Sequence, residues 1–298
     1  MKKFYSFLIP FLILLFLTAL TLILTHLNAF TLFNPKGTVS LDERNLIITA
    51  VSIMLVVVIP ALSFLIFVVT RYKFANHKTK YSPEWTGSTV AKVLLWTFPT
   101  LAMFVLAIVT WKNTHILDPY KPLPSKNPPL TIQVVALRWK WLFIYPKEHI
   151  ASVNFVEFPV NTSISFRLTA SDAPMSSFWI PSLGGQMYAM ETMENQLHLE
   201  ASKTGDFRGE AAEINGSGFS GMRFVARSVN QSDYDSWVKK VKSSNDILDT
   251  STYDKLSQPS EDNPVVFYSS VETNLYDNII MKYMEPGEKQ AIQNTDSK

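Results

Sequence analysis

The stretch AAEINGSGFSGMRF, residues 211–224, is the part of the sequence on which the interpretation of the fold depends. It places a glycine-rich turn between two segments with the composition of β-strands. The turn-forming residues are Gly216, Gly218 and Gly221. One carboxylate, Glu213, and one thioether, Met222, accompany them, as in a loop that holds a metal ion. The stretch contains no cysteine and no histidine, so the strongest ligands of such a site are missing.

The segments around this loop predict an antiparallel β-sandwich or barrel over residues 130–230. Strand-like runs occupy residues 130–135, 138–145, 163–169, 196–200 and 224–229. β-Branched and aromatic residues are frequent in these runs, and in the third run Ile164, Phe166 and Leu168 alternate along the chain. Short strands at this spacing, separated by turns that contain proline, glycine and asparagine, are typical of sandwiches and barrels.

Two amphipathic helices are predicted in the C-terminal region, residues 231–286. The first has Ser232 as its N-cap. Its apolar face consists of Tyr234, Trp237, Val238 and Val241, which follow the helical spacing. The second helix begins at Thr273. The polar residues 242–264 between the two helices predict a loop, and residues 287–298 predict a disordered tail.

Long apolar runs in the first part of the chain predict membrane spans. Residues 45–70 and 93–111 are each long enough to cross the hydrocarbon core as a helix. Together they predict a transmembrane helical hairpin over residues 40–112. A further run, residues 4–25, predicts either a signal sequence or an additional membrane anchor within residues 1–33.

The distribution of charge sets the orientation of these spans. The loop between residues 70 and 93 contains five basic residues and one acidic residue, Glu84, and loops with an excess of lysine and arginine stay in the cytoplasm. The chain after Trp111 is therefore expected outside, where the Pro-rich residues 113–129 predict a stiff linker. From Asn113 onward the chain has 17 basic and 22 acidic residues, which argues against a nucleic-acid partner.

No conventional catalytic or metal-binding group of residues stands out. The chain has no cysteine, so it offers no thiolate ligand and no disulfide. His149 and His198 are almost fifty residues apart, and the other histidines lie near the membrane spans, so a shared metal site is not expected. The methionines Met187, Met190 and Met193 recur at a spacing of three. Packing against a partner and thioether binding of copper are the two interpretations of that pattern.

The run RWKWLFIY, residues 138–145, is denser in aromatic residues than a strand requires. One interpretation is a core strand whose tryptophan N–H groups find partners. The other is a surface on which a redox partner or a neighbouring subunit docks. The possible subunit interface comprises Trp139, Trp141, Met187, Tyr188 and Met190.

Together these motifs resemble subunit II of the haem–copper respiratory oxidases. The matching segments are NPKG (34–37), YSPEW (81–85), TWKNTHILDPYKPL (110–123), RWKWLFIYP (138–146), SSFWIPSLGGQMYAM (176–190) and AAEINGSGFSGM (211–222). The resemblance to subunit II of the cytochrome bo-type ubiquinol oxidases is close. It implies an α+β membrane protein with a cupredoxin-like antiparallel β-sandwich after the hairpin. It also implies a bacterial inner membrane, with the C-terminal domain on the periplasmic side.

In cytochrome c oxidases this subunit carries a binuclear copper centre held by two cysteines, two histidines, a methionine and a carbonyl oxygen. In the family motif, Ser176 and Phe219 stand where the histidines would be, and Ala211 and Asn215 stand where the cysteines would be. Glu213 and Met222 are retained. The resemblance therefore implies a vestigial copper site that binds no metal, because soft copper needs thiolates and imidazoles. We expect Phe219 to fill space that copper would occupy.

Loss of this copper implies that a membrane quinol, and not cytochrome c, donates the electrons. This chain would then hold no cofactor and no catalytic residue. The haems and one copper would lie in a large partner subunit, accompanied by smaller membrane subunits, in a proton-pumping complex that oxidises ubiquinol. A menaquinol oxidase subunit remains an alternative, as does a membrane-anchored β-sandwich that binds an unrelated partner.

The sequence departs from the family pattern in two places. No cysteine lies near Asn28, where bo-type relatives usually carry a lipid-modified one. Lys92 or Val93 stands where the family tends to carry a glutamate linked to proton entry. A proton-entry role is therefore not carried over, and Glu84 is the nearest substitute.

Overall fold

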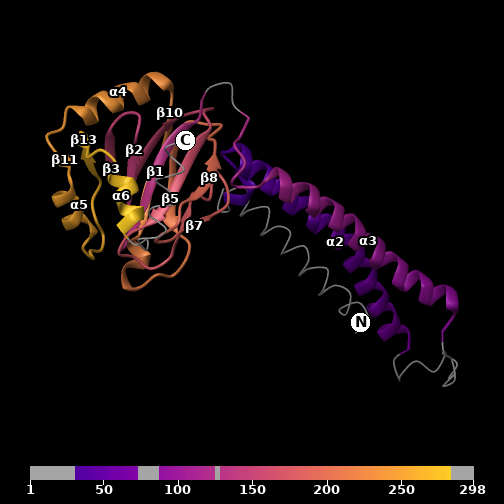
Figure 1. Ribbon diagram of the computed structural model, residues 1–298. Coiled ribbons are helices and arrows are strands. Elements are labelled where there is room, and N and C mark those ends of the chain that lie inside the picture. The colour runs from indigo at the N-terminus through magenta and orange to yellow at the C-terminus, as the bar shows by residue number, and fades with distance from the viewer. Residues whose placement is uncertain (1–30, 73–86, 125–127, 283–298) are drawn as a thin grey trace, which may run out of the picture. The chain divides into compact units, whose positions relative to one another are not determined.

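The computed structural model describes residues 31–72, 87–124 and 128–282 (Figure 1). The chain divides into two compact units, Asp42–Asp118 and the segments that precede and follow it. The apolar run of residues 4–25, most of the basic loop and the C-terminal tail lie outside the described residues. The choice between a signal sequence and an additional anchor therefore stays a sequence prediction.

Two long helices, α2 Thr38–Arg71 and α3 Thr89–Ile116, provide the predicted hairpin, and a short 3-10 turn, η1 Thr31–Phe33, precedes them. Both helices contain a window long and apolar enough to cross a membrane, and no residue of either window is buried. Pro60 and Pro99 lie inside α2 and α3. Proline is tolerated in membrane helices because neighbouring groups satisfy the carbonyl that it leaves free.

The outer domain is a β-sandwich of two sheets. One sheet has the strand order β12-β3-β2-β1-β5-β8 and the other has the order β4-β10-β9-β6-β7, while β11 and β13 pair separately. The strands are β1 Leu130–Leu137, β2 Lys140–Tyr145, β3 Ile150–Val153, β4 Phe155–Pro159, β5 Ile164–Ala170, β6 Ser176–Trp179, β7 Met187–Ala189, β8 Asn195–Leu199, β9 Gly205–Ala211, β10 Arg223–Val229, β11 Ile247–Leu248, β12 Val266–Tyr268 and β13 Ser270–Val271. Within the two sheets, β1 runs parallel to β5 and β4 parallel to β10, and the other pairs are antiparallel.

Aromatic rings fill the space between the two sheets. Trp141 and Phe143 from β2 meet Phe178 from β6 and Phe224 from β10, and all four are buried. The rings of Phe178 and Phe224 stack with centroids 5.0 Å apart. Gly209 on β9 allows this packing, since a Cβ atom there would lie 2.1 Å from the Phe224 ring. The inward faces of the strands therefore form one continuous aromatic core.

The C-terminal region builds a second core on the other face of the six-stranded sheet. Its helices are α4 Gln231–Lys242, whose buried side chains belong to the first core, and α5 Thr250–Ser257 and α6 Leu275–Lys282, which contribute to the second. Val135 of β1 and Leu142 of β2 point to this face, because side chains alternate along a strand. They pack with Leu248, Tyr253 and Tyr276. Both faces of the six-stranded sheet are thus covered, which explains its long runs of buried residues.

The sequence predictions for the C-terminal region need two corrections. Asn230, and not Ser232, occupies the N-cap of α4, and its side chain makes no capping hydrogen bond. Residues 242–264 were predicted as a loop but contain α5. The Asp249 side chain caps this helix by accepting a 2.8 Å hydrogen bond from a backbone N–H of the first turn, and Tyr253 buries its apolar side. The C-terminal region, residues 231–286, also adds β12 to the six-stranded sheet, so the region is not only helical.

The chain segment before the hairpin is fastened to the sandwich. Gly37 forms a β-bridge with Ala201. The Ser40 hydroxyl donates to the Ser182 carbonyl at 2.9 Å, and the Ser40 backbone N–H donates to the Leu183 carbonyl at 3.0 Å. A Cβ atom at Gly37 would lie 2.7 Å from the Leu183 carbonyl oxygen, so only glycine allows the two backbones to approach this closely.

The chain segment after the hairpin is fastened to β8. The Pro119 carbonyl accepts hydrogen bonds from the backbone N–H of His198 at 3.2 Å and from its ring Nδ1 at 3.0 Å. A carbonyl can only accept, so Nδ1 carries the proton. The Tyr120 hydroxyl donates to Asn195 Oδ1 at 2.7 Å. The predicted linker, residues 113–129, is therefore not free along its length, and α3 occupies its first residues.

Candidate functional site

The glycine-rich loop connects β9 to β10 and contains one 3-10 turn, η2 Ser217–Gly221. The Met222 backbone N–H donates to the Phe219 carbonyl, and the Ala211 N–H donates to the Met222 carbonyl, both at 3.1 Å. Gly216 has φ 127°, in the region that favours glycine. The structure thus contains the tight turn between two strands that the sequence predicts.

Three of the residues predicted at the vestigial copper site lie against each other. Asn215 Nδ2 donates to Ser176 Oγ at 2.7 Å and to Met222 Sδ at 3.1 Å, although Ser176 is 39 residues away in the sequence. All three side chains are buried. Asn215 Oδ1 is also buried and accepts no hydrogen bond within the described part of the chain. We name this group the Asn215 cluster.

The other three predicted positions lie at the end of β9 and in the glycine-rich loop. Ala211 is buried, Phe219 is half-buried against the core, and Glu213 is exposed. Phe219 is therefore not fully exposed to solvent. Full exposure would have contradicted the expectation that this side chain fills space. The residues that the structure describes contain no group of three or more His, Cys, Asp or Glu side chains placed to hold a metal ion. A hydroxyl, an amide and a thioether do not fit a binuclear copper centre, because it requires thiolate and imidazole ligands.

The two tryptophans of the predicted interface differ in burial and in backbone conformation. Trp141 is wholly buried in the core, so it has no surface for a partner. Trp139 lies in the turn between β1 and β2 with φ 63°, and the prediction of a strand through all of residues 138–145 is therefore wrong. Its indole packs on Gly216 and Gly218, where Cβ atoms would lie 3.1 Å and 2.5 Å from ring atoms. Trp139 thus positions the glycine-rich loop.

Residues 258–263, which the sequence analysis treated as plain loop, pack on the glycine-rich loop. Glu261 Oε1 accepts a hydrogen bond from the Ser217 hydroxyl at 2.9 Å. Lys140 is buried, and its ammonium donates to the Gln258 carbonyl at 2.9 Å. Burial lowers the pKa of Lys140. A lysine inside an aromatic strand was the available sequence signal for this contact, but it does not identify the partner.

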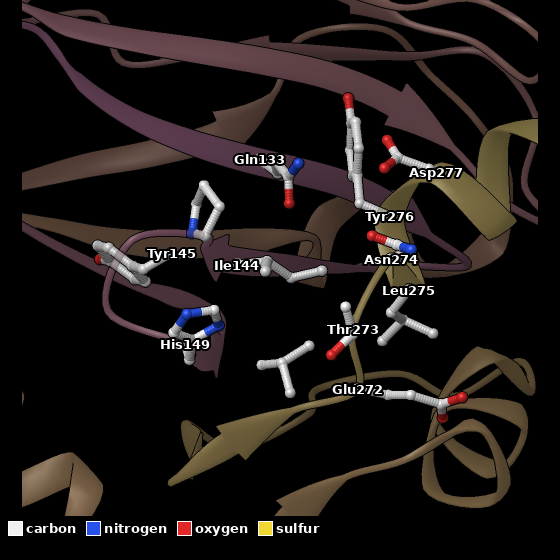
Figure 2. A pocket seen from close by; sticks show the side chains of 12 residues that line it. Gln133, Ile144, Tyr145, His149, Glu272, Thr273, Asn274, Leu275, Tyr276 and Asp277 are labelled. Carbon is white, nitrogen blue, oxygen red and sulfur yellow. The ribbon is translucent and has the colours of Figure 1, made fainter. Parts of the chain in front are cut away.

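A cavity of about 210 Å³ lies between β1, β2 and the segment that follows β13 (Figure 2). Gln133 is only 9% exposed, and its amide faces the cavity together with His149 and Tyr276. Glu272 also lines the cavity, but its carboxylate already accepts hydrogen bonds from Thr250 at 2.6 and 2.7 Å. The cavity offers polar groups without selecting one class of ligand, and no sequence motif predicted it.

A buried carboxylate lies at the edge of the five-stranded sheet. Glu157 on β4 is 4% exposed and is in register with Arg227 on β10. Arg227 forms a bidentate pair with Asp206 at 2.6 and 2.8 Å. The pKa of Glu157 is raised to about 7, chiefly by burial; Arg227 opposes the shift, and Asp206 and Asp233 contribute to it.

Comparison with known proteins gives two family matches. "Cytochrome C oxidase subunit II, periplasmic domain" matches residues 147–229, and "COX Aromatic Rich Motif" matches residues 242–287. The chain is 46% identical to cytochrome bo(3) ubiquinol oxidase subunit 2 of Pseudomonas putida over 85% of this chain and 81% of the relative. It is 41% identical to the protein of the same name from Buchnera aphidicola subsp. Schizaphis graminum over 90% of this chain and 92% of the relative. The periplasmic domain of subunit II of cytochrome oxidase of Bradyrhizobium japonicum is 26% identical, with a TM-score of 0.37, over 40% of this chain and 96% of that domain.

Two apolar membrane helices followed by a cupredoxin-like sandwich define the chain as a subunit II of the haem–copper oxidase class. The sandwich is periplasmic and the helices lie in the bacterial inner membrane. Within this class, the chain belongs to the cytochrome bo(3) ubiquinol oxidase subunit 2 family. It is therefore a subunit of a multisubunit oxidoreductase.

Replacing Asn215 with alanine is expected to destabilise the glycine-rich loop by about 1–2 kcal/mol, because two buried hydrogen bonds are lost. Oxidation of ubiquinol by the purified complex should not change. Amide hydrogen exchange of residues 211–224 in the complex measures the effect. Ser220→Ala, in an exposed part of the same loop, is the control and should leave exchange unaltered. A loss of turnover with normal exchange would contradict a purely structural role.

The stability of the sandwich is expected to fall as the pH rises from about 4.5 to about 7 and then to level off. In this interval the folded protein holds the Glu157 proton that the unfolded chain releases, because burial raises the pKa of this carboxyl. Thermal unfolding of the complex on both sides of the interval measures the trend. Glu157→Gln should flatten it, whereas Glu213→Gln, at an exposed carboxylate, should not. Identical pH profiles for wild type and Glu157→Gln would rule out this assignment.

Proposed function

We propose that this chain supports ubiquinol oxidation without carrying electrons itself. The observation that supports the proposal most strongly is the Asn215 cluster, in which protein side chains bond to each other at positions where copper ligands would stand. An electron from a soluble cytochrome would need a metal relay in this domain. A quinol dissolved in the membrane can instead reduce a haem in a partner subunit directly, and the relatives are named ubiquinol oxidases.

The redox centres of the complex lie, in this proposal, in a large partner subunit that holds the haems and a single copper ion. Smaller membrane subunits complete the assembly. The contribution of this chain is to hold the large subunit through α2 and α3 and to cover its periplasmic face. No residue of the apolar window of either helix is buried in the isolated chain, which supports this role because such apolar surfaces require lipid or protein around them.

The periplasmic contact is made, we propose, by apolar side chains next to the Asn215 cluster. Ile214 is 79% exposed and Met175 is 43% exposed, and their chain neighbours Asn215 and Ser176 are hydrogen-bonded. Tyr188, which is 40% exposed, lies on β7 beside β6. Together they form a patch of the kind that marks a protein interface. Of the residues predicted for the interface, Met187 and Met190 flank this patch in the sequence.

The complex purified through this chain is expected to contain haem and one copper ion, and to consume oxygen with ubiquinol but not with reduced cytochrome c. The physical reason is that the Asn215 cluster provides no metal relay. Metal analysis and oxygen-electrode assays with ubiquinol, menaquinol and cytochrome c as donors measure this. Copper bound to the periplasmic domain, or turnover with cytochrome c, would refute the proposal. Faster turnover with menaquinol than with ubiquinol would identify menaquinol as the electron donor.

Ile214→Asp is expected to lower recovery of the large subunit with this chain by about tenfold or more, because a carboxylate would have to be buried in an apolar contact. The domain itself should fold, since Ile214 is 79% exposed. Co-purification from membranes measures the ratio of the two subunits. Ile247→Asp, at an exposed residue of β11, is the matched control. Equal recovery for both variants would place the contact elsewhere.

A further inference from the structure

A cavity of about 460 Å³ opens between α2 and α3, and all of its lining residues belong to the unit Asp42–Asp118. Asp42 and Asn45 line it from α2, and Lys112 and Asn113 line it from α3. These residues flank the outer ends of the two apolar spans. The cavity therefore lies at the level where the headgroups of the outer leaflet meet the protein.

The two walls of the cavity carry opposite charges that do not pair. Asp42 on α2 and Lys112 on α3 both line it, yet neither forms an ion pair with any residue that the structure describes. Both side chains are exposed in the chain by itself, so a ligand in the cavity can reach each of them. A ligand that carries both signs of charge compensates both.

The two amides of the cavity have free hydrogen-bonding capacity of opposite kinds. Asn45 Oδ1 accepts from Arg44 at 3.2 Å, which leaves the Asn45 NH₂ group as a donor. Asn113 Nδ2 donates to the Val109 carbonyl at 2.8 Å, which leaves Asn113 Oδ1 as an acceptor. The cavity thus combines two donors, Lys112 and Asn45, with two acceptors, Asp42 and Asn113.

The rest of the lining is largely apolar and leads into the membrane-spanning part of the helices. Leu46 of α2 and Ile108 of α3 lie on the membrane side of the charged residues. Acyl chains would remain in contact with these side chains while the headgroup reaches the polar end. An arrangement with polar groups at the interface and apolar groups below matches the two parts of a phospholipid.

We propose that this cavity binds a phospholipid whose headgroup contains a primary ammonium and a phosphate, as in phosphatidylethanolamine. The ammonium donates to Asp42 and Asn113, and the phosphate accepts from Lys112 and Asn45. An anionic lipid without an ammonium leaves Asp42 uncompensated, and a quaternary ammonium has no N–H to donate. A single charged side chain from another subunit would compensate only one of the two walls. The site is separate from the role of the chain in quinol oxidation.

Photo-labelling of the intact complex in lipid nanodiscs tests the proposal. The probes are phosphatidylethanolamine, phosphatidylglycerol and phosphatidylcholine with the same photoreactive acyl chain, and mass spectrometry measures labelling of the peptides around residues 46 and 108. Phosphatidylethanolamine should label them about tenfold more than the other two, which corresponds to the loss of one charge-assisted contact. Equal labelling by the three lipids would overturn the proposal. This comparison uses the unaltered protein, so it does not depend on the folding of a variant.

Asp42→Asn and Lys112→Gln should each reduce labelling by phosphatidylethanolamine about tenfold, while ubiquinol turnover stays the same. Glu43→Gln and Lys121→Gln make the same changes of charge at residues that do not line the cavity, and should label like the wild type. Unchanged labelling in Asp42→Asn and Lys112→Gln would overturn the site. A photoreactive residue in place of Ile108 should capture lipid, and capture of another subunit would instead show that protein fills the cavity.

Discussion

The hydrogen bonds of the Asn215 amide hold together the end of the sandwich at which the glycine-rich loop lies. One N–H₂ group joins the hydroxyl of Ser176 on β6 to the sulfur of Met222 next to β10. Because these atoms are buried, water cannot replace either partner, and loss of the amide would leave polar atoms unpaired in an apolar surrounding. The packing of Trp139 on the loop glycines and the contact of Glu261 with Ser217 hold the same loop from other sides. The three side chains of this interaction stand at positions where ligands of a copper centre would lie.

The sequence predicted the sandwich well where one physical signal dominated. Alternating apolar residues identified β5 and β8 to within one residue, and the charge-free runs identified the hairpin helices. The sequence prediction was wrong where the backbone conformation of single residues determined the structure. The aromatic run of residues 138–145 has uniform strand propensity, which conceals the left-handed conformation of Trp139 that turns β1 into β2. Residues 242–264 are polar, and a helix as short as α5 depends on the Asp249 cap and on burial of Tyr253, neither of which leaves a periodic pattern.

The candidate site was predictable only in part, and by comparison of motifs rather than by periodicity. Spacing alone cannot bring Ser176 to Asn215, since 39 residues and the three strands β7, β8 and β9 separate them. The resemblance to the oxidase family supplied this juxtaposition, and the structure added the hydrogen bonds. The contact between Lys140 and the Gln258 carbonyl, and the buried Glu157 beside Arg227, depend on strand order and on the C-terminal region. No local sequence signal identifies the partners in such long-range contacts, so the contacts could not be predicted from one sequence.

The attachment of the segment around Gly37 and Ser40 to the sandwich has a consequence for the synthesis of the protein. The hydroxyl of Ser40 bonds to a residue 142 positions later in the chain, and Gly37 pairs with Ala201. A ribosome delivers the chain from its N-terminus, so both membrane helices emerge before the residues that will hold this segment exist. The hairpin must therefore enter the lipid with its leading end untethered. Docking of that end on the sandwich is a late event of biogenesis, and a chain released before residue 182 would have a complete hairpin without these attachment sites.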